Sequence, residues 1–202
     1  MAKQQALLTG TGGQGLILAA IMLAEGAVSA GKNVVQTQSY GPEARGGASK
    51  AEVIISQEEI SYPKVKNPDL VLAMSAEAYR KYGLPLGEET VLIVDSTFVQ
   101  EVKPRLKNFF ALPVTRLTKA EFGSEQSANV VALGVVSAVS GWLSHEDVRQ
   151  GVLQRAPKGT TERNLAALEL GWRMGLEAKA QVEDLAQAQV SDLAGLQNGG
   201  KG

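Results

Sequence analysis

The chain has 202 residues, of which 44% are hydrophobic and 20% are charged, and its formal net charge at pH 7 is −1. This length suits one domain with a core of its own, and the near-neutral charge gives no support for a nucleic-acid partner. Because the sequence has no cysteine, disulfides, thiolate metal sites and Cys-ligated iron–sulfur clusters within this chain are excluded.

Histidine is almost as scarce as cysteine. His145 is the one histidine in the sequence, so a zinc site or a Ser-His-Asp triad would have to depend on that residue. We therefore predict no metal site and no catalytic residue in this chain. No apolar run is long enough to cross a bilayer, and the first residues lack the pattern of a signal peptide. We expect no membrane partner and a cytoplasmic location.

The first half of the chain alternates strand and helix patterns. Residues 4–10 predict a strand, 10–15 a glycine turn, 16–31 a helix ending at Gly31, and 33–38 a second strand. A βαβ unit of this kind predicts that its two strands lie parallel. The following residues predict strands at 51–56 and 69–75, a helix at 76–83, a strand at 90–96 and a short edge strand at 109–114.

The last third of the chain is helical in pattern. We predict an apolar helix over 127–141, a helix over 144–156 capped by Ser144, and a long amphipathic helix from 160 to 189. The predicted fold is α/β: a Rossmann-like open, mostly parallel sheet flanked by helices, with a helical C-terminal segment. Residues 1–182 would form one domain, and residues 183–202 a helix end and flexible tail.

The sequence GTGGQG places Gly10, Gly12 and Gly15 in the spacing G-x-G-x-x-G between a strand and a helix. Such a turn lets a diphosphate approach the backbone. However, the second strand ends Gln-Thr-Gln without the acid that a dinucleotide ribose requires. Three interpretations stay open: NAD or FAD binding, close strand–helix packing alone, and contact with a phosphate, a diphosphate or a partner loop.

A second glycine-rich loop follows the second predicted strand and should lie at the same sheet edge. Gly41-Pro42 sets a rigid bend and Gly46-Gly47 a permissive one, so Arg45 between them could contact a carboxylate or phosphate with two N–H groups. Glu43 could orient Arg45, and Lys50 could add positive charge. The alternative is that Glu43 and Arg45 form an exposed ion pair.

Several stretches in this order resemble the gamma subunit of 2-oxoacid:ferredoxin oxidoreductases: GTGGQG, QTQSYGPEARGGASKAEVIIS, NPDLVLAMSAEAY, VLIVDS, ANVVALG and PKGTTERNLAALELGW. The resemblance covers about residues 5–175. The sequence TQSYGPEARGG is more similar to the corresponding loop of the 2-oxoglutarate type than to that of the pyruvate type. The indolepyruvate type, which uses a related domain, is a further possibility.

The resemblance implies a subunit of a multisubunit enzyme that is not active alone. The complex would convert 2-oxoglutarate, coenzyme A and oxidised ferredoxin to succinyl-CoA, CO2 and reduced ferredoxin. The resemblance also implies thiamine diphosphate, Mg2+ and [4Fe-4S] clusters held by alpha and beta subunits, or by these together with a ferredoxin-like delta subunit, and no cofactor in this chain. The sequence agrees, because it lacks cysteines and any Gly-Asp-Gly run followed by Asn for a magnesium–diphosphate site.

The resemblance also implies that this chain covers the active-site and CoA region of the complex. The residues that match the family's two loops, together with Lys50, are the predicted CoA-binding or interface site: Gly10, Gly12, Gly13, Gln14, Gly15, Tyr40, Gly41, Pro42, Glu43, Arg45, Gly46, Gly47 and Lys50. Two rival functions stay open. One is a stand-alone Rossmann-type nucleotide-binding oxidoreductase, and the other is a purely structural assembly subunit.

Three other residues have a functional and a structural interpretation. We expect Asp95, at the end of a strand, to cap the following turn, and His145 to face solvent. Asn129 should cap or pack its helix, with contact to the glycine turn as the alternative. The small residues of the 127–141 helix allow close backbone approach, either in the core or at a subunit interface.

Overall fold

The structure is a computed structural model, and it describes residues 3–39, 48–84, 86–100, 102 and 106–198. Within these residues the strands form one six-stranded sheet in the order β2-β3-β1-β4-β5-β6. The strands are β1 (Gln4–Thr11), β2 (Asn33–Ser39), β3 (Ala48–Ser56), β4 (Leu70–Ala73), β5 (Val91–Asp95) and β6 (Phe109–Leu112).

The sheet is mostly parallel, as predicted, with one reversed strand. β1, β4, β5 and β6 pair in parallel, whereas β3 pairs antiparallel with both β1 and β2. β1 and β2 therefore run in the same direction, but they are not neighbours, because β3 lies between them. The prediction that these two strands lie parallel is confirmed, although β3 separates them.

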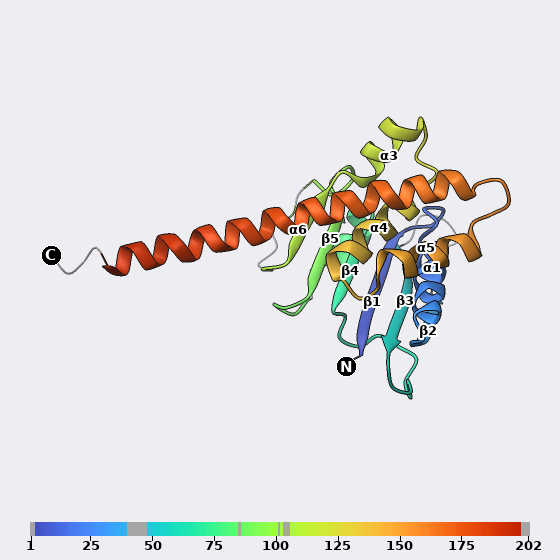
Figure 1. Cartoon of the computed structure of the whole chain (residues 1–202), viewed down its shortest axis with the longest axis horizontal. Helices are drawn as coiled ribbons and strands as arrows, with labels where there is room; N and C mark the ends of the chain where they lie inside the picture. Colours follow the sequence, from blue (N-terminus) through green and yellow to red (C-terminus); the bar gives the residue numbers. More distant parts are fainter. Residues whose placement is uncertain (1–2, 40–47, 85, 101, 103–105, 199–202) are drawn as a thin grey trace.

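Helices cover the sheet in two layers. They are α1 (Leu16–Ser29), α2 (Ala76–Tyr82), α3 (Val114–Phe122), α4 (Ala128–Ser140), α5 (His145–Arg155) and α6 (Thr161–Asn198). Buried side chains of α1, α4, α5 and α6 join those of one sheet face in the larger core, whereas α2 and nearby loops cover part of the other face. α6 passes along the domain and extends beyond the sheet (Figure 1).

α4 is the central helix of the larger core. Its residues from Ala128 to Val139 are buried, and α6 packs along it. Glycines make this contact close: a Cβ atom at Gly171 would overlap the carbonyl oxygen of Val131, and one at Gly134 would lie 2.7 Å from the backbone N of Trp172. The small residues of α4 therefore serve the core of this domain.

α3 is a helix that the sequence interpretation missed. It begins after Pro113 and ends at Gly123, whose φ of 70° places it in the left-handed region. Proline before the first turn and glycine after the last are typical helix boundaries. The pattern was hidden because the helix is short and mostly polar, with few positions to reveal a helical period.

The Ser144 cap of α5 is confirmed, whereas His145, the first residue of this helix, is less exposed than predicted. Ser144 accepts from the backbone N of Asp147, and the Asp147 side chain accepts in return from the Ser144 backbone, which makes a capping box. His145 is only partly exposed, at 33% of its side chain: its ring meets Trp172 edge-on at 4.8 Å between centroids, and Nε2 lies 2.8 Å from Glu169 Oε1.

The long C-terminal helix is continuous over Thr161–Asn198 and so passes the predicted domain end at 182 without a break. In the described part of the chain, no helix combines the length and the apolar character that a membrane span requires.

Candidate functional site

The glycine turn lies where β1 ends and α1 begins. Gly13 and Gly15 have φ angles of 90° and 72°, a conformation that side chains strongly disfavour. Gly15 occupies the N-cap of α1, and no side chain caps that helix. A Cβ at Gly10 would overlap Gln14 Oε1 and lie 2.6 Å from Leu16 Cδ1. Close strand–helix packing therefore explains part of this glycine pattern.

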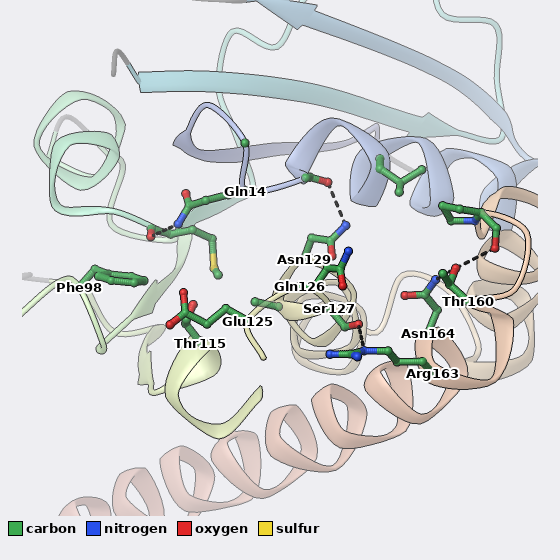
Figure 2. A pocket seen from close by; sticks show the side chains of 16 residues that line it. Gln14, Phe98, Thr115, Glu125, Gln126, Ser127, Asn129, Thr160, Arg163 and Asn164 are labelled. Atoms are coloured by element: carbon green, nitrogen blue, oxygen red, sulfur yellow. Dashed lines mark hydrogen bonds between the residues drawn. The ribbon is translucent and has the colours of Figure 1, made fainter. Parts of the chain in front are cut away.

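Gln14 fixes the turn to the neighbouring strand. Its Oε1 accepts from the backbone N of Thr11 at 2.8 Å, and its Nε2 donates to the carbonyl oxygen of Met74 at 3.0 Å. Met74 follows β4, so the side chain spans the crevice between the carboxyl ends of β1 and β4 (Figure 2). In a Rossmann fold the diphosphate of a dinucleotide passes at this place, and Gln14 occupies it.

Asn129 holds the turn from the other side. It lies in the first turn of α4 and is 6% exposed. Its Nδ2 donates to the carbonyl oxygen of Gly15 at 3.1 Å, and Figure 2 shows the two groups facing each other across the gap between α1 and α4. Ser127, not Asn129, is the N-cap of α4. The contact with the glycine turn is thus confirmed in place of the cap.

A cavity of about 450 Å³ opens beside the turn. It lies at the carboxyl edge of the parallel strands, between the starts of α1, α4 and α6 (Figure 2). Its walls include the turn itself, two apolar side chains that follow β4 and β5, and polar side chains from α4 and α6: Gly13, Gln14, Gly15, Met74, Phe98, Ser127, Asn129, Arg163 and Asn164.

Arg163 is a positively charged group in this cavity. Its Nε donates to Ser127 Oγ at 3.1 Å and its Nη2 to Ser124 Oγ at 2.7 Å. Both partners are uncharged, and no carboxylate among the described residues forms an ion pair with Arg163. Glu125, which also lines the cavity, lies 3.4 Å from Lys119. The guanidinium therefore keeps donors for a further partner.

The predicted second loop, Tyr40, Gly41, Pro42, Glu43, Arg45, Gly46 and Gly47, lies outside the described residues. The strands on each side are longer than predicted, because β2 continues to Ser39 and β3 begins at Ala48. Ser39 pairs with Lys50, and Thr11 pairs with Ala48. Both ends of this segment therefore lie at the sheet edge that carries the glycine turn, as expected from the sequence.

Lys50 is placed in the sheet rather than in a loop. Its Nζ lies 3.0 Å from Glu52 Oε1, and Glu52 is only 5% exposed. The other carboxylate oxygen of Glu52 accepts from Thr37 Oγ1 at 2.8 Å. The structure thus supplies Lys50 with a counter-charge inside this chain, which the sequence interpretation did not anticipate.

Asp95 is a structural capping residue, as expected. Its carboxylate accepts from the backbone N of Thr97 at 3.0 Å and of Thr115 at 3.1 Å. The side chain thus ties the end of β5 to the first turn of α3 and has no solvent exposure. Among the described residues no group of three or more His, Cys, Asp or Glu side chains is arranged to hold a metal ion.

Replacing Gly15 with alanine is expected to destabilise the protein by about 2 kcal/mol, through the positive φ and a contact of 2.8 Å between the new Cβ and Asn129 Nδ2. In an Asn129→Ala background the contact disappears, so the same substitution should cost about 1 kcal/mol less. Urea unfolding of the two single variants and the double variant measures this coupling. Strictly additive costs would show that the two residues do not interact.

The sequence interpretation found the glycine turn but missed Arg163, Ser127 and Asn164 on the opposite wall. A signal was present, because Arg163 lies in the first turn of a helix that follows the turn-forming PKGT segment. Nothing in the sequence alone shows that this helix start faces the glycine turn.

Comparison with known proteins covers nearly the whole chain. Residues 5–174 match the family model described as pyruvate ferredoxin/flavodoxin oxidoreductase. The chain is 41% identical to the 2-oxoglutarate synthase subunit KorC of Methanocaldococcus jannaschii, over 87% of this chain and 95% of the relative. It is 42% identical to the KorC subunit of Archaeoglobus fulgidus, over 83% and 86% of the two chains.

A solved structure agrees with these sequence matches. The gamma subunit of a keto/oxoacid ferredoxin oxidoreductase from Geobacter sulfurreducens PCA superposes with a TM-score of 0.81 at 40% identity. The match covers 88% of this chain and 99% of that subunit, so the two chains share one fold over nearly their full length.

Proposed function

The chain belongs to the pyruvate ferredoxin/flavodoxin oxidoreductase family, and on this premise we propose that it is the gamma subunit of a 2-oxoglutarate:ferredoxin oxidoreductase. The observation that carries the proposal is the match to a 2-oxoglutarate synthase subunit: the two sequences are 41% identical, and the match covers 95% of that subunit. A match of that extent leaves little of the relative without a counterpart here. The chain is then one subunit of an oxidoreductase and is not active alone.

The complex oxidises 2-oxoglutarate with coenzyme A. The bond between the carboxylate carbon and the keto carbon breaks, CO2 leaves, and the remaining acyl group forms a thioester with the CoA sulfur. Two electrons pass to two oxidised ferredoxins and one proton is released. Thiamine diphosphate with Mg2+ supplies the carbon chemistry, and [4Fe-4S] clusters carry the electrons.

This chain has no cysteine to ligate a [4Fe-4S] cluster and no Gly-Asp-Gly run followed by Asn for a magnesium–diphosphate site. We assign the cofactors to alpha and beta subunits and to a ferredoxin-like delta subunit. This chain, in the proposal, covers the active-site and CoA region with the glycine turn and the 40–47 segment.

The match to the family model ends at residue 174, which supports a domain of residues 1–182 followed by a C-terminal helical segment. A cytoplasmic location is part of the proposal.

Reconstitution tests this function. The chain is co-expressed with the candidate alpha, beta and delta subunits, and ferredoxin reduction is followed with 2-oxoglutarate and CoA. Activity is expected only when all subunits are present, and the chain alone should show none. Turnover by the isolated chain, or an assembled complex that prefers pyruvate or indolepyruvate, would contradict the proposal.

Replacing Arg45 with alanine in the assembled complex is expected to raise the KM for CoA or for 2-oxoglutarate about 10-fold, because a charge-assisted hydrogen bond to a phosphate or carboxylate is lost. Steady-state kinetics with each substrate varied in turn measure the effect. Arg80→Ala, on the exposed surface of α2, is the matched control and should leave both KM values unchanged. Unaltered kinetics of an intact Arg45→Ala complex would count against this role.

A further inference from the structure

We propose that the tip of the glycine turn and the cavity beside it receive a segment of a neighbouring subunit that carries a carboxylate. This inference rests on the proposed function, because it requires that the chain works inside a multisubunit complex. Four features support it. Gly12 is a glycine that the fold of this chain does not require, and the Gln14 side chain fills the crevice beside it. Arg163 has no carboxylate partner among the described residues, and two buried Asn side chains have carbonyl oxygens that accept no hydrogen bond from those residues.

Gly12, at the tip of the turn, is not required by this chain. Its φ lies outside the left-handed region, and a Cβ atom built on it would meet nothing within 4 Å. Alanine at this position would also reduce the conformational freedom of the unfolded chain and so favour folding. Both Gly12 and Gly13 are exposed. The bare backbone at Gly12 therefore fits close approach by a group from outside the chain.

The crevice next to this tip is closed to a diphosphate. Gln14 spans it with hydrogen bonds to the backbone N of Thr11 and the carbonyl oxygen of Met74. A phosphate ligand would have to displace this side chain; its oxygens can accept from the Thr11 N but cannot donate to the Met74 carbonyl oxygen, which would lose its partner at a cost in free energy. A polypeptide that rests on the Gly12–Gly13 backbone needs no such displacement.

Arg163 gives the cavity its charge preference. Among the described residues its guanidinium donates hydrogen bonds only to the hydroxyl oxygens of Ser124 and Ser127, and it lies 5.7 Å from the centre of the Phe122 ring. Neither α1 nor α4 has an acidic residue in its first turn or a side-chain cap, and both begin at this cavity. The positive helix ends add to the charge of the arginine. Glu125 also lines the cavity, but its carboxylate is paired with Lys119, so a carboxylate from outside remains the group complementary to Arg163.

The two buried amides distinguish a polypeptide from a phosphate. Asn129 and Asn164 line the cavity and are 6% and 7% exposed. Their Nδ2 groups donate within this chain, to the Gly15 carbonyl and to Thr160 Oγ1. Their Oδ1 atoms accept no hydrogen bond from the residues that the structure describes, and Figure 2 shows the oxygen of Asn164 on the side away from Thr160.

These carbonyl oxygens can accept hydrogen bonds from a ligand in the cavity, and an ionised phosphate with acceptor oxygens offers them no donor. A protein segment supplies backbone N–H groups for Asn129 and Asn164 together with a carboxylate for Arg163. Phe98, which is 44% exposed and lines the same cavity, provides an apolar surface for the stem of that side chain. The arrangement of donors and acceptors thus favours a polypeptide occupant.

Assembly affinity tests the proposal. The chain and the remaining subunits of the complex are purified separately, and the Kd of reassociation is measured for the wild-type chain, Gly12→Gln and Arg163→Gln. We expect each variant to raise the Kd about 10-fold or more, the size of effect typical of central interface residues. Gly87→Gln and Arg80→Gln, both at exposed positions away from the cavity, should not change it.

Thermal unfolding of each isolated variant accompanies the binding measurement. Gly12→Gln should unfold at the wild-type temperature, so its weaker association cannot come from misfolding. If Arg163→Gln proves unstable, the Kd of the Gly12→Gln variant alone decides the test. An unchanged Kd for Gly12→Gln would overturn the inference. An unchanged Kd with a raised KM for CoA would show a small phosphate ligand instead, and loss of a wild-type self-dimer would show a second copy. Either result would also overturn the inference.

The proposed function fails separately from this inference. If the wild-type chain does not associate with thiamine-binding subunits at all, the function itself is wrong. If the wild-type complex forms and turns over 2-oxoglutarate while the cavity variants assemble as tightly as wild type, only the assignment of this surface is wrong.

Discussion

Replacing Gly171 with alanine is expected to lower the free energy of unfolding by about 3 kcal/mol or more. The new Cβ would overlap the carbonyl oxygen of Val131 and lie 2.7 Å from its carbonyl carbon. These are backbone atoms of a buried helix, so no side-chain rotation relieves the contact and α4 and α6 must move apart. Because α4 is the centre of the larger core, that movement would disturb the packing of several elements.

Urea unfolding followed by circular dichroism measures this loss. Gly87→Ala is the matched control: a Cβ there would lie 3.7 Å from Thr90 Oγ1, an ordinary contact, and the position is exposed. Its effect should stay within about 0.5 kcal/mol. Equal stabilities for the two variants would mean that the two helices are not packed as closely as described.

Replacing Asp95 with alanine is expected to destabilise the protein by about 3 kcal/mol. The substitution removes the acceptor for the backbone N atoms of Thr97 and Thr115, at a position without solvent exposure. Each buried donor left without a partner costs about 1–3 kcal/mol. The change should also loosen α3, whose first turn depends on this carboxylate.

Asp69→Ala provides the comparison, because Asp69 also accepts from a backbone N, that of Gln5 at 2.7 Å, but on the exposed surface. Water can replace an acceptor there, so the cost should be about 1 kcal/mol or less. Thermal and urea unfolding of both variants give the difference. A loss of equal size at both positions would contradict the importance that we assign to the burial of Asp95.

Local patterns in the sequence predicted most elements of the fold, because hydrophobic period and breakers act over a few residues. The 90–96 strand, the helix over 76–83 with its glycine end and the capped helix at Ser144 all correspond to elements of the structure. The position of β3 between β1 and β2 was not predictable in this way. Strand order depends on which strand edges pair after folding. The βαβ pattern of β1, α1 and β2 gives no sign that the later strand β3 pairs between them in the opposite direction.

The candidate site, too, was predicted where it depends on local sequence and missed where it depends on the packing of distant elements. The resemblance to the oxidoreductase gamma subunits, carried by GTGGQG and the following stretches, is confirmed by the family match. The wall formed by Asn129 and Arg163 comes from residues more than 100 positions away from the turn, and only the packing of α4 and α6 brings them to it. The contact of His145 with Trp172 was not predicted for a similar reason, because Trp172 comes from another helix.

The reversed strand β3 has a consequence for how this family can diversify. Since β2 and β3 are antiparallel partners with a fixed register from Asn33–Ser56 to Ser39–Lys50, the connector between them can gain, lose or exchange residues while the pairing below stays intact. A connector grafted from a homologue with another oxoacid preference should therefore be accepted by this scaffold. The sequence between these two strands can therefore change without a change in the strand order of the sheet.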